Sequence, residues 1–472
     1  MVLALCCLAQ LMVVLDVSVV NVALPSIGAD LGFGAAGLPW IVNGYALVFA
    51  GFLLLGGRLA DLYGHRRVFL LGLGLFTAAS LVGGLATGPG MLVAARAAQG
   101  LGAAVLAPVT LTVLTAAYPE GAGRTRAVAV WTAAGSAGGT VGNLVGGLLT
   151  EALSWRWILL INVPIGAVAL VATARLLADS TARGRRQRFD LPGAVLATAG
   201  LLAFAYSIAR SEAYGWSSPR TALPLVLGLG ALAGFAALQA RPTASRTPLL
   251  ALRLFRARAI WLGNVLMLLA GASLAPMWYF LSLYMQNVLG YGPLETGLGF
   301  LPHTVLGVLL GVRLTPWAMR HVGRRPLIAA GALTAAAGFL WQSRAAEAST
   351  YWSGVFGPAV VMTLGSALFI TPVTTTVLSG VPRSDAGAAS GVMNTVKQVG
   401  SGLGLSALAV IATPAASSPA ALAEAYSRAF LAMAALLAAV AVLAAALPGR
   451  ARDEPDRARA AGGSGIGTSH ER

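Results

Sequence analysis

The sequence predicts an all-α integral membrane protein with two six-helix bundles and two additional transmembrane helices between them, fourteen helices in all. Of the 472 residues, 57% are hydrophobic and only 10% are charged, and the mean hydropathy is +0.78. Soluble domains usually carry about 25% charged residues. Apolar runs recur along the chain, and several exceed the roughly 20 residues that a helix needs to cross about 30 Å of hydrocarbon.

The apolar runs fall into three groups, separated by polar and arginine-rich breaks. The first six lie near residues 2–27, 38–57, 68–87, 91–117, 127–150 and 156–177, and two more lie near 191–209 and 221–239. The last six lie near 259–285, 295–315, 326–343, 352–378, 386–413 and 424–447. We therefore expect an N-terminal bundle (1–177), an inserted pair with basic linkers (178–258), a C-terminal bundle (259–447) and a disordered cytoplasmic tail (448–472).

The basic residues indicate how the chain is oriented. The formal net charge is +16, and all but one of the 32 basic residues are arginines, most of them in short breaks between apolar runs. This placement follows the positive-inside rule rather than the pattern of a nucleic-acid-binding surface. It predicts a multi-pass plasma-membrane protein with both termini in the cytoplasm. The opening run lacks a basic n-region and is too long for a signal peptide, so we expect it to be a retained span.

A short similarity between the two predicted bundles indicates a duplicated unit. Gly64 is followed by two arginines and then by Gly72, and Gly323 is followed by two arginines and then by Gly331. Both stretches follow the second run of their group, so they occupy equivalent positions in the two predicted bundles. Many transporters are built from internal repeats of this kind.

Cofactor and metal chemistry find no support in the sequence. The two cysteines, Cys6 and Cys7, are adjacent within the first run, where helix packing accounts for them. The chain has no GxxxxGK[ST] loop for a nucleotide. We expect no cofactor and no enzymatic activity.

Asp16 alone among the 16 acidic residues lies deep within a predicted span. A carboxylate near the bilayer centre costs about 2.5–3.5 kcal/mol on insertion scales, so such residues face a bundle interior or a wet cavity. Burial favours the protonated form, and an approaching cation favours the charged form. Asp16 is therefore our candidate proton carrier, and a plain hydrogen bond to a neighbouring helix is the alternative.

Arg96, in the fourth predicted span, is the matching buried cation. Its guanidinium stays charged and needs a partner or water. We expect a mobile interaction between Asp16 and Arg96 that couples protonation to helix position, with a fixed structural ion pair as the alternative. Asn21 and Gln99 lie within two turns of these residues and are candidates for the same cavity, although packing hydrogen bonds explain them equally well.

The break after the second run, GGRLADLYGHRR, is a candidate cytoplasmic gate. Asp61 is placed to pair with Arg66 or Arg67, or with a helix N-terminus, whose dipole favours an anion. Contacts that break and re-form between two conformations would make a gate, and the alternative is a solvated charged turn.

Together these segments resemble the major facilitator superfamily, and within it the fourteen-span drug:proton antiporters. LDVSVVNVALP is similar to the first-span signature of that group, and LVAARAAQGLGAA to its fourth-span motif, in which the arginine is implicated in proton coupling. GGRLADLYGHRR resembles the loop motif of the superfamily but departs from it at Leu62 and His65. The matching loop positions are Gly57, Leu59, Asp61, Gly64 and Arg66.

The fifth span resembles the antiporter motif only in part. GGTVGNLVGG has asparagine at Asn143, where the family has proline, which puts the direction of transport in question; it matches at Gly138, Gly142, Gly146 and Gly147. Small residues also let helices approach closely in lipid, and we attribute most of the glycines to packing of this kind.

The substrate cavity is predicted from aromatic residues. MWYFLSLYMQ provides Trp278, Tyr279 and Tyr284, whose rings could stack on flat or cationic ligands. Interfacial aromatic belts have the same composition. His303 lies within a predicted span and could share proton handling, although a packing role accounts for it as well.

These observations predict a monomeric, proton-driven exporter that binds small hydrophobic or cationic drugs and works by alternating access in the lipid bilayer. A dedicated exporter or proton-coupled importer of a single metabolite is the nearest alternative. A membrane-embedded enzyme would need several buried acids or histidines, and the predicted spans contain one acid and one histidine away from their ends.

Overall fold

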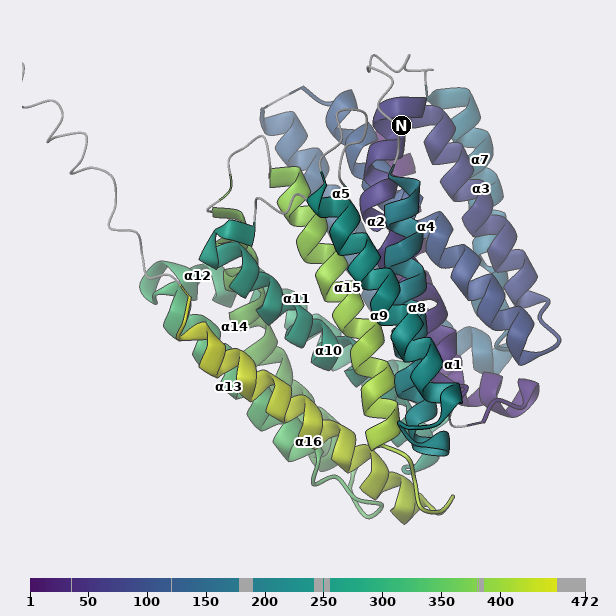
Figure 1. Ribbon diagram of the computed structural model, residues 1–472, viewed down its shortest axis with the longest axis vertical. Helices are drawn as coiled ribbons and strands as arrows, with labels where there is room; N and C mark the ends of the chain where they lie inside the picture. Colours follow the sequence, from purple (N-terminus) through teal and green to yellow (C-terminus); the bar gives the residue numbers. More distant parts are fainter. Residues whose placement is uncertain are drawn as a thin grey trace, which may run out of the picture.

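The chain folds into a bundle of long helices, shown by a computed structural model in Figure 1. The structure describes residues 1–34, 36–119, 121–177, 190–241, 249, 255–379, 381 and 386–447, and every regular element within them is a helix. The predicted tail, 448–472, and most of the two basic linkers lie outside the described residues.

The helices of the first half follow the six predicted apolar runs. The sixth run forms two consecutive helices, α6 and α7, with a break at Ile161. The bounds are α1 (Val2–Leu31), α2 (Pro39–Tyr63), α3 (His65–Gly84), α4 (Pro89–Ala117), α5 (Ala122–Ala152), α6 (Trp157–Leu160) and α7 (Asn162–Leu176).

The inserted pair and the second half follow the predicted order as well. The pair consists of α8 (Leu191–Tyr214) and α9 (Pro219–Ala240). Short π-helical segments continue two of the later helices. The second half contains α10 (Arg258–Asn287), α11 (Pro293–Leu309), η2 (Leu310–Leu314), α12 (Thr315–His321), α13 (Arg324–Gln342), η3 (Trp352–Phe356), α14 (Gly357–Ser379), α15 (Ala386–Ile411) and α16 (Pro419–Ala444).

Ten helices in the described residues are long and apolar enough to cross a membrane. The other long helices are α2, α5, α13 and α15, which lie among these ten in the bundle. Helix α5 is rich in glycine, serine and threonine, which lower its hydropathy without preventing it from packing among apolar neighbours. The structure therefore supports a multi-pass membrane protein.

Each half packs mainly on itself. In the first half α1 packs on α5, and α4 packs on α2 and α3; in the second half α10 packs on α15, and α13 packs on α14 and α16. The halves meet where α5 lies against α11, α2 against α15, and α1 against α10.

Among the described residues, four hydrogen bonds join the two halves, and they lie toward the end of the molecule opposite Met1. The Asn43 amide donates to Ser406 Oγ at 2.9 Å. Ser282 Oγ donates to the Asn21 carbonyl and the Gln286 amide to the Val22 carbonyl, each at 2.8 Å. The backbone amide of Leu294 donates to the Glu151 carboxylate at 2.9 Å.

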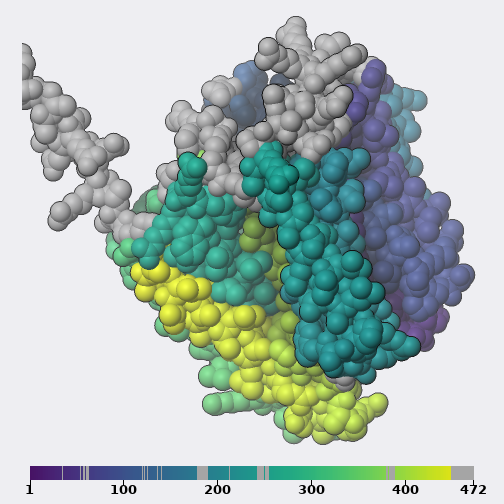
Figure 2. All heavy atoms as spheres, in the orientation of Figure 1, coloured from purple at the N-terminus to yellow at the C-terminus, as the bar shows by residue number. Residues whose placement is uncertain are grey.

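The α8–α9 hairpin covers the line along which α2 and α15 meet, on the face shown in Figure 2. Gly51 of α2 lies directly against Thr198 of α8, where any side chain at position 51 would collide with it. The contact with α15 is instead a layer of aliphatic side chains, in which Val399 and Leu403 pack beside Leu201.

Candidate functional site

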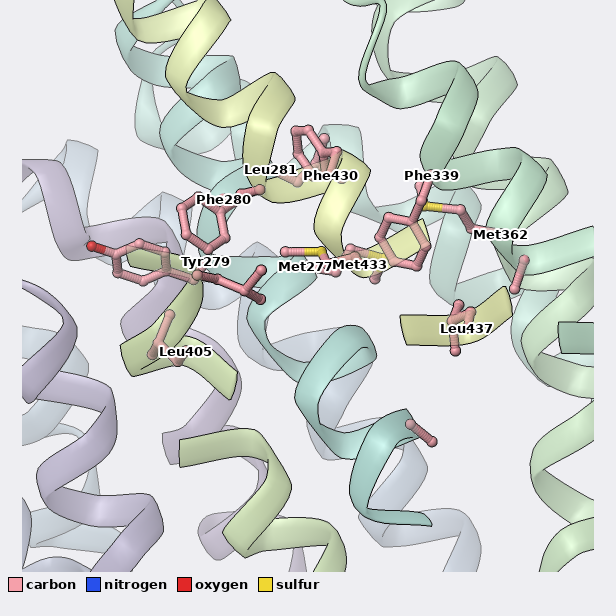
Figure 3. Close-up of a cluster of buried hydrophobic side chains, with 14 of the residues drawn as sticks. Met277, Tyr279, Phe280, Leu281, Phe339, Met362, Leu405, Phe430, Met433 and Leu437 are labelled. Atoms are coloured by element: carbon pink, nitrogen blue, oxygen red, sulfur yellow. The ribbon is translucent and has the colours of Figure 1, made fainter. Parts of the chain in front are cut away.

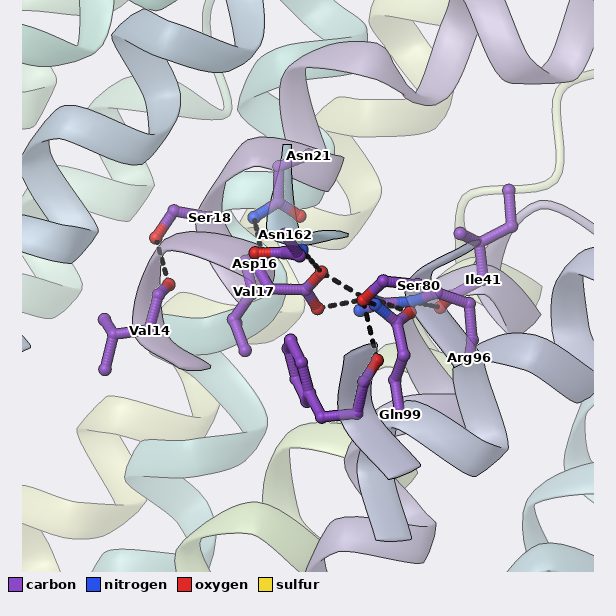
Figure 4. Close-up of polar contacts among 11 residues, drawn as sticks. Val14, Asp16, Val17, Ser18, Asn21, Ile41, Ser80, Arg96, Gln99 and Asn162 are labelled. Carbon is purple, nitrogen blue, oxygen red and sulfur yellow. Dashed lines mark hydrogen bonds and ion pairs between the residues drawn. The ribbon is translucent and has the colours of Figure 1, made fainter. Parts of the chain in front are cut away.

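The buried carboxylate of Asp16 lies at the centre of a polar cluster inside the first half (Figure 4). Its side chain is 0% exposed. Oδ2 lies 2.5 Å from a terminal nitrogen of Arg96. Oδ1 accepts hydrogen bonds from the side-chain amides of Gln99 and Asn162, each at 3.0 Å. Three donors therefore surround a single carboxylate.

Arg96 is also buried, at 2% exposure, and its charge is balanced from several directions. Its Nε donates to the Ile41 carbonyl at 3.1 Å, and a terminal nitrogen donates to Gln99 Oε1 at 2.9 Å. The guanidinium lies over the ring of Tyr45, 4.6 Å from its centroid. An aromatic face attracts a cation, most strongly where water is excluded.

Helix geometry explains why these groups converge. Arg96 and Gln99 are three residues apart on α4 and so project from the same face. Asp16 projects from the middle of α1, and Asn162 is the first residue of α7. Gln99 also donates to Ser80 Oγ on α3 at 2.7 Å. The cluster therefore ties α1, α3, α4 and α7 together, and the Ile41 carbonyl adds α2.

Asn162, Ser80 and Tyr45 were not predicted as members of the site. Each is a single uncharged polar residue within an apolar stretch, and such residues are common in membrane helices. Asn162 carried the clearest signal, because an amide interrupts the apolar run ILLINVP.

The cluster can respond to a proton. The carboxylate faces only N–H donors in the structure, so a proton on Asp16 would meet a donor rather than an acceptor. It would also leave the Arg96 charge without its partner. A protonated Asp16 would therefore not fit the hydrogen bonds that the structure shows.

Asn21 does not join this cluster. Its amide donates to the Val17 carbonyl of its own helix at 3.3 Å. Its backbone carbonyl accepts the bond from Ser282, so Asn21 lies where α1 meets α10. Gln99, in contrast, is a direct partner of both Asp16 and Arg96.

The structure brings Trp278 and His303 together. The Trp278 ring lies edge-on to His303 at 4.9 Å between centroids and 5.0 Å from Phe300. Nδ1 of His303 lies 2.7 Å from Thr363 Oγ1. Helices α10, α11 and α14 together form this aromatic corner.

Tyr279 and Tyr284 lie apart from that corner. Tyr284 is 1% exposed and donates to the Ala346 carbonyl at 3.0 Å, in the connection that follows α13. Tyr279 points its hydroxyl away from the cluster around Phe280 and Phe430 (Figure 3). The aromatic residues of α10 thus project from different sides of the helix and do not form one stacking surface.

The predicted loop is shorter than expected. Helix α2 continues to Tyr63, because Leu59 and Ala60 favour helix, and it ends at Gly64, whose φ of 88° is in the left-handed region. Arg66 donates to the Ala174 carbonyl at 2.7 Å, and Arg67 is exposed. Gly57 and Asp61 lie in the last turns of α2, at positions whose side chains the structure does not describe, so the predicted Asp61 pairing lies outside the described residues.

The glycines of α5 are packing positions. A Cβ on Gly138, Gly142 or Gly146 would lie 2.9 Å or less from atoms of α1. Gly147 abuts the backbone of Pro293, at the start of α11. Asn143, 3% exposed, presents its carbonyl to Gly297 of α11. One face of α5 thus packs on α1 and the adjacent face on the second half.

Comparison with known proteins gives consistent matches over most of the chain. The Major Facilitator Superfamily profile matches residues 6–405. The cephamycin export protein of Amycolatopsis lactamdurans is 52% identical over 455 residues, which cover 96% of this chain and 93% of that protein. The puromycin resistance protein of Streptomyces alboniger is 39% identical over 413 residues, covering 86% and 80%. An auto-inhibited POT family peptide transporter shares the fold, with a TM-score of 0.69 at 15% identity and coverage of 96% and 98%.

Removing one partner of the buried ion pair should destabilise the protein more than removing both. We expect Arg96→Leu to lower the free energy of unfolding by about 3–5 kcal/mol, because it leaves the Asp16 charge buried and unpaired. The double variant Asp16→Asn, Arg96→Leu should recover most of that loss. Thermal unfolding of the purified protein in detergent measures both. A double variant as unstable as the single one would show that pairing is not the source of the effect.

Crowding between α1 and α5 should be specific to the glycines that lie closest to α1. Gly142→Ala would place a Cβ 2.8 Å from Ser18 Cβ, and overpacking of this kind costs about 1–3 kcal/mol. Gly139 is one turn away on the same helix, and a Cβ there would lie 3.8 Å from its nearest neighbours. Gly142→Ala should therefore lower the melting temperature and Gly139→Ala should not; equal shifts would contradict the packing described above.

Proposed function

The chain belongs to the major facilitator superfamily, and on this premise we propose that it is a proton-driven exporter of small hydrophobic or cationic antibiotic-like molecules. The observation that carries the proposal is the buried Asp16–Arg96 pair in the middle of α1 and α4. The named functions of the cephamycin and puromycin relatives support efflux over other kinds of transport.

The proposed topology has fourteen membrane crossings, with both termini in the cytoplasm of a bacterial plasma membrane. Residues 1–177 and 259–447 form the two six-helix bundles, 178–258 contain the inserted pair, and the chain acts as a monomer. Two features support this arrangement: the arginine-rich breaks on one side of the membrane and the self-packing of each half.

In the proposed cycle, proton binding at Asp16 releases Arg96. The guanidinium then keeps its hydrogen bonds to Gln99 and the Ile41 carbonyl and its contact with the Tyr45 ring. Helix α1 also touches α5 in its own half and α10 in the other. A shift of α1 at Asp16 therefore reaches the interface between the halves, where it favours one orientation of the cavity over the other.

The remaining predicted residues take supporting roles. Trp278 and His303, which form the aromatic corner, line the substrate path with Asn21 and Gln99, and aromatic rings there attract cations. Arg66 and Arg67 form the cytoplasmic gate together with Gly57, Asp61 and Gly64. The close contact of α5 with α11, at Gly147 and Gly297, lets the halves slide on small residues.

A dedicated exporter of one compound is the second candidate. One observation favours it: the 52% identical relative is named for the export of a single antibiotic class. Asn143, which stands where the family has proline, bears instead on the direction of transport. Uptake into everted vesicles and into right-side-out vesicles separates export from import. Comparing several unrelated compounds separates a dedicated transporter from a multidrug transporter.

Substrate-induced proton release tests the proposal directly. Tetraphenylphosphonium or puromycin is added to the purified protein in weakly buffered detergent, and pyranine fluorescence reports the released protons. The native chain should release protons, and Asp16→Asn should release none above background, because it cannot carry the proton.

Asp190→Asn is the matched control. Asp190 is another buried carboxylate, 2% exposed, and it caps α8 by accepting from the Gly193 amide at 3.0 Å. This variant should release protons as the native chain does. Equal release from the native chain and Asp16→Asn would refute the role of Asp16.

A further inference from the structure

A second cavity lies apart from the Asp16 cluster, at the end of the molecule opposite Met1. It has a volume of about 210 Å³ and is enclosed by residues of α2, α8, α10, α15 and α16 together with the connections beside them. Its walls therefore come from both halves and from the inserted hairpin. The residues lining it are apolar, aromatic or uncharged polar ones.

Two polar groups on the cavity wall lack partners. Asn43 lines the cavity and is 1% exposed. Its side-chain nitrogen donates to Ser406 Oγ, but its Oδ1 accepts no hydrogen bond within the described residues. The Tyr279 hydroxyl, on the same wall, makes no hydrogen bond in the part of the chain that the structure describes. A buried acceptor without a donor is unfavourable, so a ligand that supplies the donor gains free energy there.

The rest of the wall suits a flat ring. The Tyr279 ring lies 5.1 Å from Phe280, and Phe280 lies 6.1 Å from Tyr426. The Tyr426 oxygen accepts from the Asn287 amide at 3.2 Å, which fixes the edge of this aromatic wall. Trp40 completes the lining from α2.

We propose that this cavity binds an uncharged aromatic molecule that carries a carboxamide. The amide N–H would donate to Asn43 Oδ1, and the amide carbonyl would accept from the Tyr279 hydroxyl. Charged ligands are excluded because the wall offers no counter-charge and burial of an unpaired charge is costly.

Occupancy of the cavity would hold the two halves together. Asn43 belongs to the first half, and Tyr279 and Ser406 belong to the second, so the walls separate when this end of the molecule opens. A ligand that fits only the closed arrangement stabilises it by its differential affinity. Such a ligand would therefore inhibit transport. This consequence rests on the alternating access proposed above, but binding itself does not.

Photolabelling tests the binding site. The probe is 4-benzoylbenzamide, an uncharged benzophenone with a carboxamide, applied to the purified full-length protein, with labelled peptides mapped by mass spectrometry. Labels should map to the first turns of α2 and the last turns of α15. The anionic analogue 4-benzoylbenzoate has nearly the same shape and should label these peptides far less.

Matched variants distinguish the contribution of the Asn43 Oδ1 acceptor from that of the Asn43–Ser406 hydrogen bond, which joins the two halves. Asn43→Leu removes both, whereas Ser406→Ala removes the bond but keeps Oδ1; labelling should be lost in the first and kept in the second. Ala409→Phe fills the cavity without touching either polar group and should also abolish labelling, which keeps the test decisive if Asn43→Leu fails to fold. Unchanged labelling in Ala409→Phe, or labels that map to α11, which carries His303, would overturn the proposal.

Transport measurements test the second part. The amide should inhibit energised uptake of puromycin into everted vesicles that contain the native protein, and inhibition should disappear in Ala409→Phe. Mapped labelling without inhibition would refute the claim that the ligand holds the halves together. If the native protein shows no energised uptake at all, the proposed function fails, and labelling still decides whether the site exists.

Discussion

The first half of the molecule is organised around one buried ion pair. Asp16 and Arg96 are almost fully shielded from solvent, and each would be unfavourable in that place without the other. Gln99, Asn162 and the Ile41 carbonyl add further hydrogen bonds and Gln99 also reaches Ser80, so five helices contribute to one charge-neutral unit. Disturbing the charge of either residue therefore acts on the packing of the whole half.

The contacts between the halves differ in character from those within them. Between the halves, the hydrogen bonds are accepted by backbone carbonyls, by the Ser406 hydroxyl and by the Glu151 carboxylate, and the closest approaches involve glycines such as Gly147 and Gly297. These contacts contain no buried charge pair within the described residues. Such interfaces can separate and re-form without exposing an unpaired charge, whereas the Asp16 cluster stays inside one half.

The sequence was enough to predict the order and rough limits of the helices, because a bilayer demands long apolar runs and the breaks between them are polar. It also singled out Asp16 and Arg96, since a charge in such a run is conspicuous. Asn162, 146 positions from Asp16, was missed, because an uncharged amide gives no sign of the helix it will face. The aromatic residues of α10 were grouped by composition, and only the helix geometry shows that Tyr284 turns away from Trp278. The end of α2 was placed too early, because hydropathy marks the edge of the lipid rather than the end of a helix.

The inserted hairpin is attached unequally to its two neighbours. It meets α2 through a close steric fit at Gly51 and Thr198 in addition to the apolar contact of Leu47, and it meets α15 through the apolar side chains of Val399 and Leu403. Closely interlocked side chains and backbone resist sliding, whereas apolar side chains that do not interlock offer less resistance. A relative movement of the two halves would therefore carry the hairpin with α2 more readily than with α15.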